Sequence, residues 1–245
     1  MRNPIFYEKN KYYHIYNRGT DKRIIFNDKH DLDRFYKSIQ EFNSVEPIGS
    51  IFENRNNSKE YSCGGSTPTE GKLLEIVAFC LNPNHYHFIL TPLVEGGISE
   101  FMRRLNGGYT SYFNQKYKRS GVLFQGRFKS VLIDSDSYLR FLSVYINLNF
   151  EVHLKFQNMK DKQLFHKSSW DEYIKAKIIK GKLGEENQII NGKNDICEKF
   201  MVLNHFDSAK EYQKFAEETL IEIKRKRYGD EEVIKKNFSV GKNFN

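Results

Sequence analysis

The stretch KLLEIVAFCLNPNHYHFILTP, residues 72–92, decides the fold. Residues 73–81 are mostly apolar and predict one strand, and residues 85–92 predict a second. Asn82, Pro83 and Asn84 separate the two runs, and these residue types favour a tight turn. The segment is therefore predicted to form a β-hairpin.

Hydrophobic periodicity places the other elements on either side of this hairpin. Apolar residues at helical spacing indicate helices, and short aromatic or β-branched runs indicate strands. The expected elements are a strand over residues 11–18, a helix over 29–42, the hairpin, a helix over 98–117, a strand over 128–133, and a helix capped at Asp134 or Ser135 that runs through Asn149.

The order of these elements, β-α-β-β-α-β-α, predicts an α+β fold. The first six elements match the ferredoxin-like split βαβ plan, in which an antiparallel sheet carries its helices on one face. Many unrelated proteins share that plan, so the fold alone does not identify a function.

The chain divides by composition into a main domain over residues 1–152 and a small, mainly helical accessory region over residues 153–245. Residues 43–71 are rich in Asn, Ser, Gly, Thr and charged residues. A connection of 29 residues is long for a compact domain, so we expect a flexible surface insertion there.

The overall charge favours a polyanionic partner. Lys and Arg number 39 against 31 Asp and Glu, a formal net charge of +8. No run approaches the roughly 20 apolar residues of a membrane span, and no signal-peptide pattern opens the chain. The three cysteines, Cys63, Cys80 and Cys197, match neither a zinc pattern nor a disulfide framework, so we expect a reduced, cytoplasmic protein without a membrane partner.

The histidines of the second hairpin strand are candidate metal ligands. His85 and His87 flank Tyr86, and side chains alternate between the two faces of a strand. Both imidazoles should therefore point the same way, with Tyr86 on the opposite face. Two neighbouring imidazoles form half of a metal site, although the same spacing also fits two surface histidines.

The last expected helix carries the complementary half of such a site. Tyr145 and Asn149 are four residues apart and should share one helical face. If that face packs over His85 and His87, the Asn149 amide oxygen completes a mixed site that suits Mg²⁺ or Mn²⁺, and the phenol lies beside it. In the alternative reading, Tyr145 only continues the apolar stripe of the helix.

A run of basic and aromatic residues is a candidate nucleic-acid surface. Residues 101–133 contain no acidic residue, and cations interleaved with aromatic rings are typical of single-strand binding. A solvated basic face is the alternative. Arg18 and the tail segment 224–227 are further candidates for phosphate contact. The basic residues of the run are Arg103, Arg104, Lys116, Lys118, Arg119, Arg127 and Lys129.

Four sequence blocks together resemble the HUH-type single-tyrosine transposases, and among them the REP-associated tyrosine transposase branch. Their order along the chain is also that of the family, and residues 166–173 match more loosely. The blocks are YHIYNRG (13–19), PNHYH (83–87), GVLFQGRFKS (121–130) and YINLN (145–149).

The resemblance implies a role for each matching residue. His85 and His87 would be paired metal ligands, Asn149 the third ligand, and Tyr145 the nucleophile that forms a 5′-phosphotyrosine. It further implies Mg²⁺ or Mn²⁺ as cofactor, single-stranded or hairpin DNA as substrate, and a monomer or homodimer.

Two positions depart from the family pattern. Tyr86 stands where an aliphatic residue is usual, and Phe150 replaces a proline after the asparagine. A buried ring at position 86 is compatible with the fold, whereas Phe150 can change the end of the helix near Asn149.

Several alternatives remain open at the level of sequence. Tyr109, Tyr112 and Tyr117 are rival nucleophiles, although they match no tyrosine of the family. A replication or conjugation nickase would use the same chemistry. A non-catalytic DNA- or RNA-binding protein on a ferredoxin-like scaffold would use the same fold.

Overall fold

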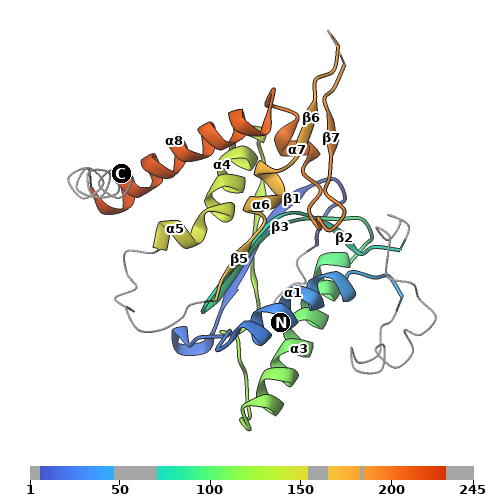
Figure 1. Ribbon diagram of the computed structural model, residues 1–245. Helices are drawn as coiled ribbons and strands as arrows, with labels where there is room; N and C mark the ends of the chain where they lie inside the picture. The colour runs from blue at the N-terminus through green and yellow to red at the C-terminus, as the bar shows by residue number, and fades with distance from the viewer. Residues whose placement is uncertain (1–5, 47–70, 154–164, 183–184, 230–245) are drawn as a thin grey trace.

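The computed structural model describes residues 6–46, 71–153, 165–182 and 185–229. Within them, a five-stranded sheet has the order β4-β1-β3-β2-β5 (Figure 1). All neighbouring strands are antiparallel. The strands are β1 (Tyr12–Arg18), β2 (Leu74–Asn82), β3 (His85–Pro92), β4 (Lys129–Ile133) and β5 (Lys167–Ser168).

The predicted hairpin lies in the middle of this sheet. Strands β2 and β3 pair from Leu74↔Pro92 to Asn82↔His85, and β1 pairs along the other side of β3. The segment that follows the short 3-10 helix η1 (Thr20–Lys22) contacts the hairpin turn, where the Pro83 carbonyl accepts the Ile25 N–H at 2.7 Å. The hairpin expectation is confirmed.

One face of the sheet is covered by two helices, α1 (Lys29–Glu41) and α3 (Gly97–Lys116) (Figure 1). Asp28 caps α1 by accepting the Asp31 N–H, as its residue type favours. The apolar stripes of both helices, including Phe35 and Leu105, bury against Phe88 on the sheet. Strand order and helix placement match the ferredoxin-like plan, so the predicted α+β fold is confirmed.

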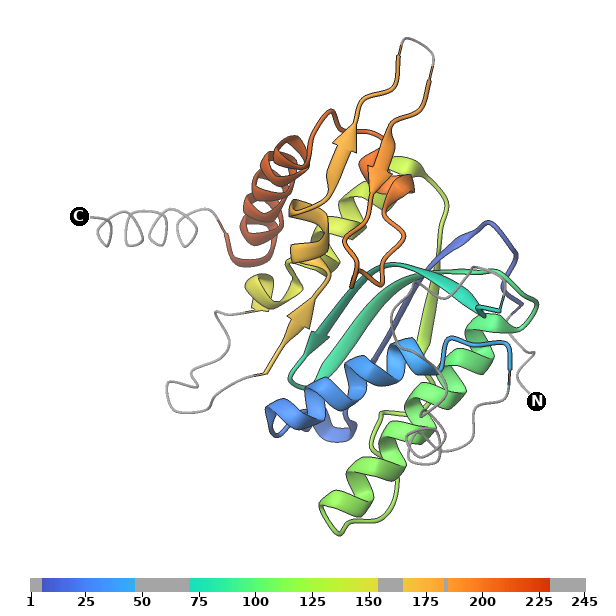
Figure 2. The same ribbon diagram turned by 45° about the vertical axis from the view of Figure 1, so that its right-hand side comes forward.

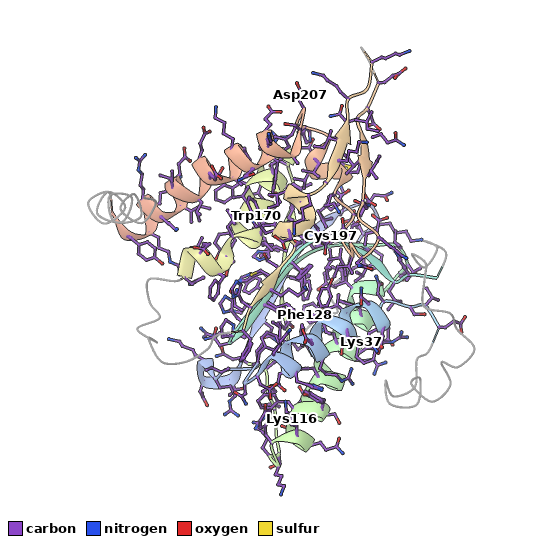
Figure 3. All side chains as sticks on the ribbon, viewed as in Figure 1. Lys37, Lys116, Phe128, Trp170, Cys197 and Asp207 are labelled. Atoms are coloured by element: carbon purple, nitrogen blue, oxygen red, sulfur yellow. The ribbon has the colours of Figure 1, made fainter. Side chains whose placement is uncertain are left out.

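The structure adds a second helical layer on the other face. Helix α4 (Asp136–Asn147) lies there, and Leu142 and Ile146 pack in one cluster with Ala78 and Ile89 of the sheet. Figure 3 shows side chains filling the space on both sides of the sheet, with Trp170 and Lys116 on opposite sides. The central strands are therefore buried on both faces.

The C-terminal region packs on this second layer and contains strands as well as helices (Figure 2). Its strand β5 extends the main sheet beside β2, and β6 and β7 form a separate hairpin. Residues 47–70, most of the expected insertion, lie outside the described residues. The remaining elements are α6 (Trp170–Ile174), β6 (Lys177–Ile179), β7 (Gln188–Ile190), α7 (Phe200–Leu203) and α8 (Ala209–Tyr228).

The end of α4 corrects one expectation from the sequence. Ser135 caps the helix by accepting the Tyr138 N–H, as expected, but the helix ends at Asn147. Leu148 turns the chain, with φ −106° and ψ 17°, and Asn149 opens a separate short helix, α5 (Asn149–His153). The apolar pattern continues through the break, because Leu148 is buried like the stripe before it, so periodicity alone did not reveal it.

None of the helices in the described ranges is both long enough and apolar enough to cross a membrane.

Candidate active site

The two histidines of β3 lie on the face covered by α4. Their ring centroids are 5.2 Å apart and the rings are perpendicular, at 89°. Tyr86 points to the opposite face, where it is fully buried and its hydroxyl donates to Asn106 Oδ1 at 2.8 Å. The predicted alternation is observed, and the core under α3 accommodates the unusual ring at position 86.

Hydrogen bonds fix the tautomer of His85. The Asn84 amide nitrogen donates to the Lys22 carbonyl at 3.2 Å, which leaves the Asn84 Oδ1 facing His85 Nδ1 at 2.6 Å. The His85 Nδ1 must therefore carry the proton and donate it to that oxygen. The lone pair of His85 then lies on Nε2, the nitrogen that points into the site.

A hydrogen-bond acceptor, the Asn149 amide oxygen, faces the lone pair on His85 Nε2. The Asn149 Oδ1 is 3.2 Å from His85 Nε2, and both atoms lie within hydrogen-bond distance of the Asn82 amide nitrogen, at 2.9 and 3.1 Å. Asn149 is fully buried, and the hydrogen bond that its Oδ1 accepts from Asn82 orients the oxygen. Two acceptors facing one another at this distance form an environment that favours a positive charge between them.

A third histidine, His14 on β1, contacts His87. His14 Nε2 and His87 Nδ1 are 2.9 Å apart in a buried position. Burial lowers the pKa of His14 to about 4 and that of His87 well below its usual value, because both rings are cut off from water. Both imidazoles are thus neutral at pH 7. If His87 Nδ1–H donates to His14, the Nε2 of His87 is free to bind a metal.

The residues fit a divalent ion. Among the described residues, no three His, Cys, Asp or Glu side chains are arranged so that they could hold a metal ion, so the third protein ligand would have to be the Asn149 amide oxygen. Two imidazoles bound to one ion at about 2.1 Å have ring centroids about 5 Å apart. The observed 5.2 Å between His85 and His87 agrees with that spacing. An N,N,O set with open positions suits Mg²⁺ or Mn²⁺.

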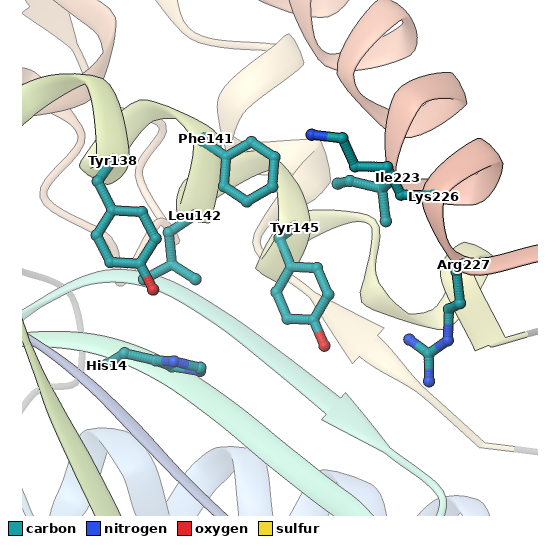
Figure 4. Close-up of a pocket in the computed structure, with 8 residues that line it drawn as sticks. All are labelled: His14, Tyr138, Phe141, Leu142, Tyr145, Ile223, Lys226 and Arg227. Carbon is teal, nitrogen blue, oxygen red and sulfur yellow. The ribbon is translucent and has the colours of Figure 1, made fainter.

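Tyr145 on α4 lies beside this group. Its ring centroid is 5.9 Å from that of His87, with the planes at 81°. The ring is only partly buried, and it lines a pocket of about 430 Å³ together with His14. Figure 4 shows its hydroxyl directed from α4 toward the sheet. The phenol therefore has access to a bound molecule and is not enclosed in the core.

The rival tyrosines lie on the opposite side of the sheet. Tyr109 donates its hydroxyl to the Ile25 carbonyl inside the core under α3. Tyr112 and Tyr117 donate theirs to the buried carboxylate of Asp31 at 2.9 and 2.8 Å. The structure does not bring these three hydroxyls to the histidines.

The predicted basic residues divide between the two faces. Arg18 pairs with His85 across β1 and β3, and Lys129 pairs with Tyr16, so both lie on the histidine face. Lys129 Nζ is 5.9 Å from the centre of the Tyr16 ring, which in turn stacks on His87. These two cations are thus next to the candidate site.

The cations of α3 are engaged in ion pairs on the far side. Arg103 and Arg104 both contact Glu100, at 2.7 and 2.6 Å, and Lys116 contacts Asp28 and Asp31, each at 2.7 Å. Lys118 follows the helix with a positive φ of 49°, Arg119 donates to Asn114 Oδ1 at 2.7 Å, and Arg127 follows the Gly126 turn. DNA contact by these residues remains a prediction.

Sequence reasoning missed several residues at the site. His14 lies in the first block of the resemblance, and the pairing of β1 with β3 could have indicated its face. Asn82 was read only as a turn residue, although it ends β2 beside His85. Lys226 and Arg227 were not missed, because they belong to the tail segment 224–227 that the sequence suggested for phosphate contact, and they line the same pocket as Tyr145.

One family model covers three of the four sequence blocks. Residues 65–149 match the family model described as "Transposase IS200 like". A search of curated proteins gives no match. Among solved structures, a REP-associated tyrosine transposase bound to a REP hairpin is 18% identical, with a TM-score of 0.41 over 64% of this chain and 74% of that chain.

A transposase candidate from Deinococcus radiodurans R1 is 14% identical, with a TM-score of 0.32 over 64% of this chain and 98% of that chain. The family match includes the hairpin with His85 and His87 and extends to Tyr145 and Asn149. Through this segment the chain carries an IS200-like transposase domain, which supports the resemblance to a transposase that the sequence blocks indicate.

Proposed function

We propose that the chain cleaves and rejoins single-stranded or hairpin DNA, with Tyr145 as the nucleophile and a 5′-phosphotyrosine as the intermediate. The observation that carries this proposal is the position of the Tyr145 ring, 5.9 Å from His87 and open to a pocket. A tyrosine that served only the core would turn its ring away from the histidines. We also propose assignment to the REP-associated branch, as the sequence blocks imply.

His85, His87 and Asn149 would hold the divalent ion, Mg²⁺ or Mn²⁺. The first two are neutral at physiological pH because burial lowers the pKa of both imidazoles. When bound, the ion supplies charge neutralisation at the scissile phosphate and helps to hold it for in-line attack. The hydrogen bonds of His85 to Asn84 and of His87 to His14 orient the two rings for this role.

The strand-breaking step exchanges one phosphodiester bond for another. The Tyr145 oxygen forms a bond to phosphorus, and the bond from phosphorus to the 3′ oxygen breaks. The phenol loses its proton, and the departing 3′ oxygen gains one. A phenol has a pKa near 10 and attacks poorly while neutral, so stabilising the phenolate would accelerate the step.

The rejoining step reverses this exchange with a new partner. A 3′-hydroxyl attacks the phosphotyrosine, the phosphodiester re-forms, and the phenol is restored. The covalent link conserves the phosphoester, so no nucleotide triphosphate is needed. A nickase of replication or conjugation would share the first step, whereas a non-catalytic DNA- or RNA-binding protein would bind without forming the link.

A covalent adduct assay tests the proposal. The protein is incubated with Mg²⁺ or Mn²⁺ and single-stranded DNA that contains candidate hairpins, and a protein–DNA adduct is sought on a denaturing gel. We expect an adduct with the parent and none with Tyr145→Phe, although that variant still binds DNA. Tyr112→Phe is the control, since Tyr112 lies on α3 on the opposite face of the sheet and is one of the rival tyrosines.

Tyr112→Phe should form the adduct at the parental level. An adduct formed by Tyr145→Phe would identify another nucleophile. A parent that binds DNA without forming an adduct on any substrate would favour the non-catalytic alternative.

A further inference from the structure

The pocket beside Tyr145 is built by two helices from different parts of the chain. One wall belongs to α4 and the opposite wall to α8, while His14 of the sheet forms the floor (Figure 4). Its volume of about 430 Å³ is large enough for one nucleotide. The wall residues are Tyr138, Phe141, Leu142 and Tyr145 from α4, and Ile223, Lys226 and Arg227 from α8.

The charge of this pocket is positive. No carboxylate is among its lining residues, and its two charged side chains are Lys226 and Arg227. Figure 4 shows the Arg227 guanidinium and the Tyr145 hydroxyl directed toward the sheet from the two walls.

The α8 wall is fixed to the rest of the domain at both ends. Near its start, the Tyr212 hydroxyl accepts from Asn147 Nδ2 of α4 at 3.0 Å in a buried position. At its end, the Tyr228 hydroxyl donates to the Val152 carbonyl of α5 at 2.6 Å. Because Tyr228 follows Arg227 directly, this bond fixes the backbone that carries the guanidinium.

The α4 wall presents an aromatic surface to the same space. Phe141 is 38% exposed, an unusual exposure for a phenylalanine on a helix that otherwise buries its apolar stripe. Exposed aromatic rings next to cations are the combination that binds single-stranded nucleic acid, because the rings stack on bases and the cations neutralise phosphates.

We propose that this pocket is the subsite for the nucleotide adjoining the scissile phosphate, with Arg227 bound to a backbone phosphate and Phe141 packed against the base. The proposal rests on the proposed function for its choice of single-stranded DNA. A guanidinium suits this role because its planar fork of donors matches two phosphate oxygens. Through Arg227, the C-terminal helix becomes part of the DNA-binding site.

The test compares the parent with variants at Arg227, Lys210 and Phe141 for binding to a single-stranded oligonucleotide. Arg227→Gln removes the charge at the pocket, and Arg227→Lys keeps it without the fork. Lys210→Gln removes a charge from the first turn of the same helix, 17 residues away or about 25 Å along the axis. Fluorescence anisotropy is measured with EDTA present, over a range of salt concentrations, so that binding is observed without cleavage.

We expect Arg227→Gln to weaken binding about tenfold, as loss of one charge-assisted hydrogen bond predicts. The slope of log affinity against log salt should also decrease by about 0.7, the value for one phosphate contact on a single strand. Arg227→Lys should keep the slope and lose part of the affinity. Phe141→Leu should weaken binding without changing the slope, because it removes stacking and no charge.

Two outcomes would overturn the proposal. One is an Arg227→Gln variant that matches Lys210→Gln in both affinity and slope, and the other is a parent that does not bind single-stranded DNA. Equal thermal midpoints for all variants exclude a folding defect. If the parent forms an adduct while Arg227→Gln behaves as the control, the proposed function stands and only the subsite fails. If the parent binds but forms no adduct, the proposed function fails, and the salt slopes still decide the role of Arg227.

Discussion

At the scale of single residues, the site depends on which nitrogen of each histidine carries the proton. The contacts of Asn84 settle this for His85, because its amide is held by the Lys22 carbonyl. For His87 the partner is His14, and the outcome depends on which ring donates. A side chain at position 14 that accepts from the His87 Nδ1–H leaves the Nε2 of His87 free.

His14→Gln and His14→Leu provide a matched test of this arrangement. The glutamine oxygen can accept the His87 Nδ1–H, whereas leucine leaves that buried donor unpaired, at a cost of about 1–3 kcal/mol. We expect His14→Leu to weaken Mn²⁺ binding about 10- to 100-fold, as the loss of an outer partner of a metal ligand usually does. His14→Gln should stay near the parent. Titration of Mn²⁺ followed by electron paramagnetic resonance measures both, and equal affinities of the two variants would contradict the arrangement.

At the scale of elements, a buried network of four hydrogen-bonded side chains joins α4 to α8 and to the start of α6. The Tyr212 hydroxyl contacts Ser143 Oγ at 3.1 Å and Asn147 Nδ2 at 3.0 Å, and Ser169 donates to Asn147 Oδ1. All four side chains are fully or almost fully buried. Polar groups in such a place stabilise the packing only while each of them has its partner.

Tyr212→Phe removes one hydroxyl from this network, so Ser143 and Asn147 each lose a hydrogen-bond partner. We expect the free energy of unfolding to fall by about 1–3 kcal/mol, the cost of buried donors and acceptors that lose a hydrogen bond. Urea unfolding measures the change, with Tyr138→Phe as the control. A Tyr212→Phe midpoint equal to that of the control would mean that the network does not stabilise the contact of α4 with α8.

The elements also show how far the sequence could predict the fold. Strand β3 begins and ends where expected, because its aromatic and β-branched run follows a turn that contains proline. Strands β5, β6 and β7 have only two or three residues each, too few to show a period of two. β5 pairs with β2 from a distant part of the chain, and β6 and β7 pair only with each other, so a local pattern does not reveal them.

Like the fold, the candidate site could be predicted from the sequence only in part. His85, His87, Tyr145 and Asn149 belong to compact blocks, and the structure brings them together. His14 and Arg227 reach the site through strand pairing and through the packing of α8, across most of the length of the chain. Such long-range contacts depend on tertiary packing and leave no spacing pattern in the sequence.

At the scale of the whole molecule, the two faces of the sheet differ in whether their arginines are paired with a carboxylate. On the face of α3, Arg103 and Arg104 share the carboxylate of Glu100, whose pKa they lower to about 2. On the histidine face, Arg18 is exposed and bonded to the neutral amide of Gln125. An arginine next to a neutral partner keeps its full charge for a phosphate.

We therefore expect Arg18→Gln to weaken single-stranded DNA binding more than Arg103→Gln. The first should cost about tenfold, the effect of one lost charge-assisted contact, and the second about twofold or less. Anisotropy titrations with EDTA, at one fixed salt concentration, separate this effect from any change at the metal ligands. A larger loss for Arg103→Gln would place the DNA on the face of α3, as the basic run in the sequence also allows.

The turn at Leu148 has a mechanical consequence. If Tyr145 and Asn149 lay on one continuous helix, any tilt of that helix that moved the phenol toward a phosphate would also move the Asn149 amide oxygen away from His85. With the backbone turning between them, the phenol and the amide oxygen are carried by two separate helices, α4 and α5. The position of one can thus be adjusted without disturbing the other.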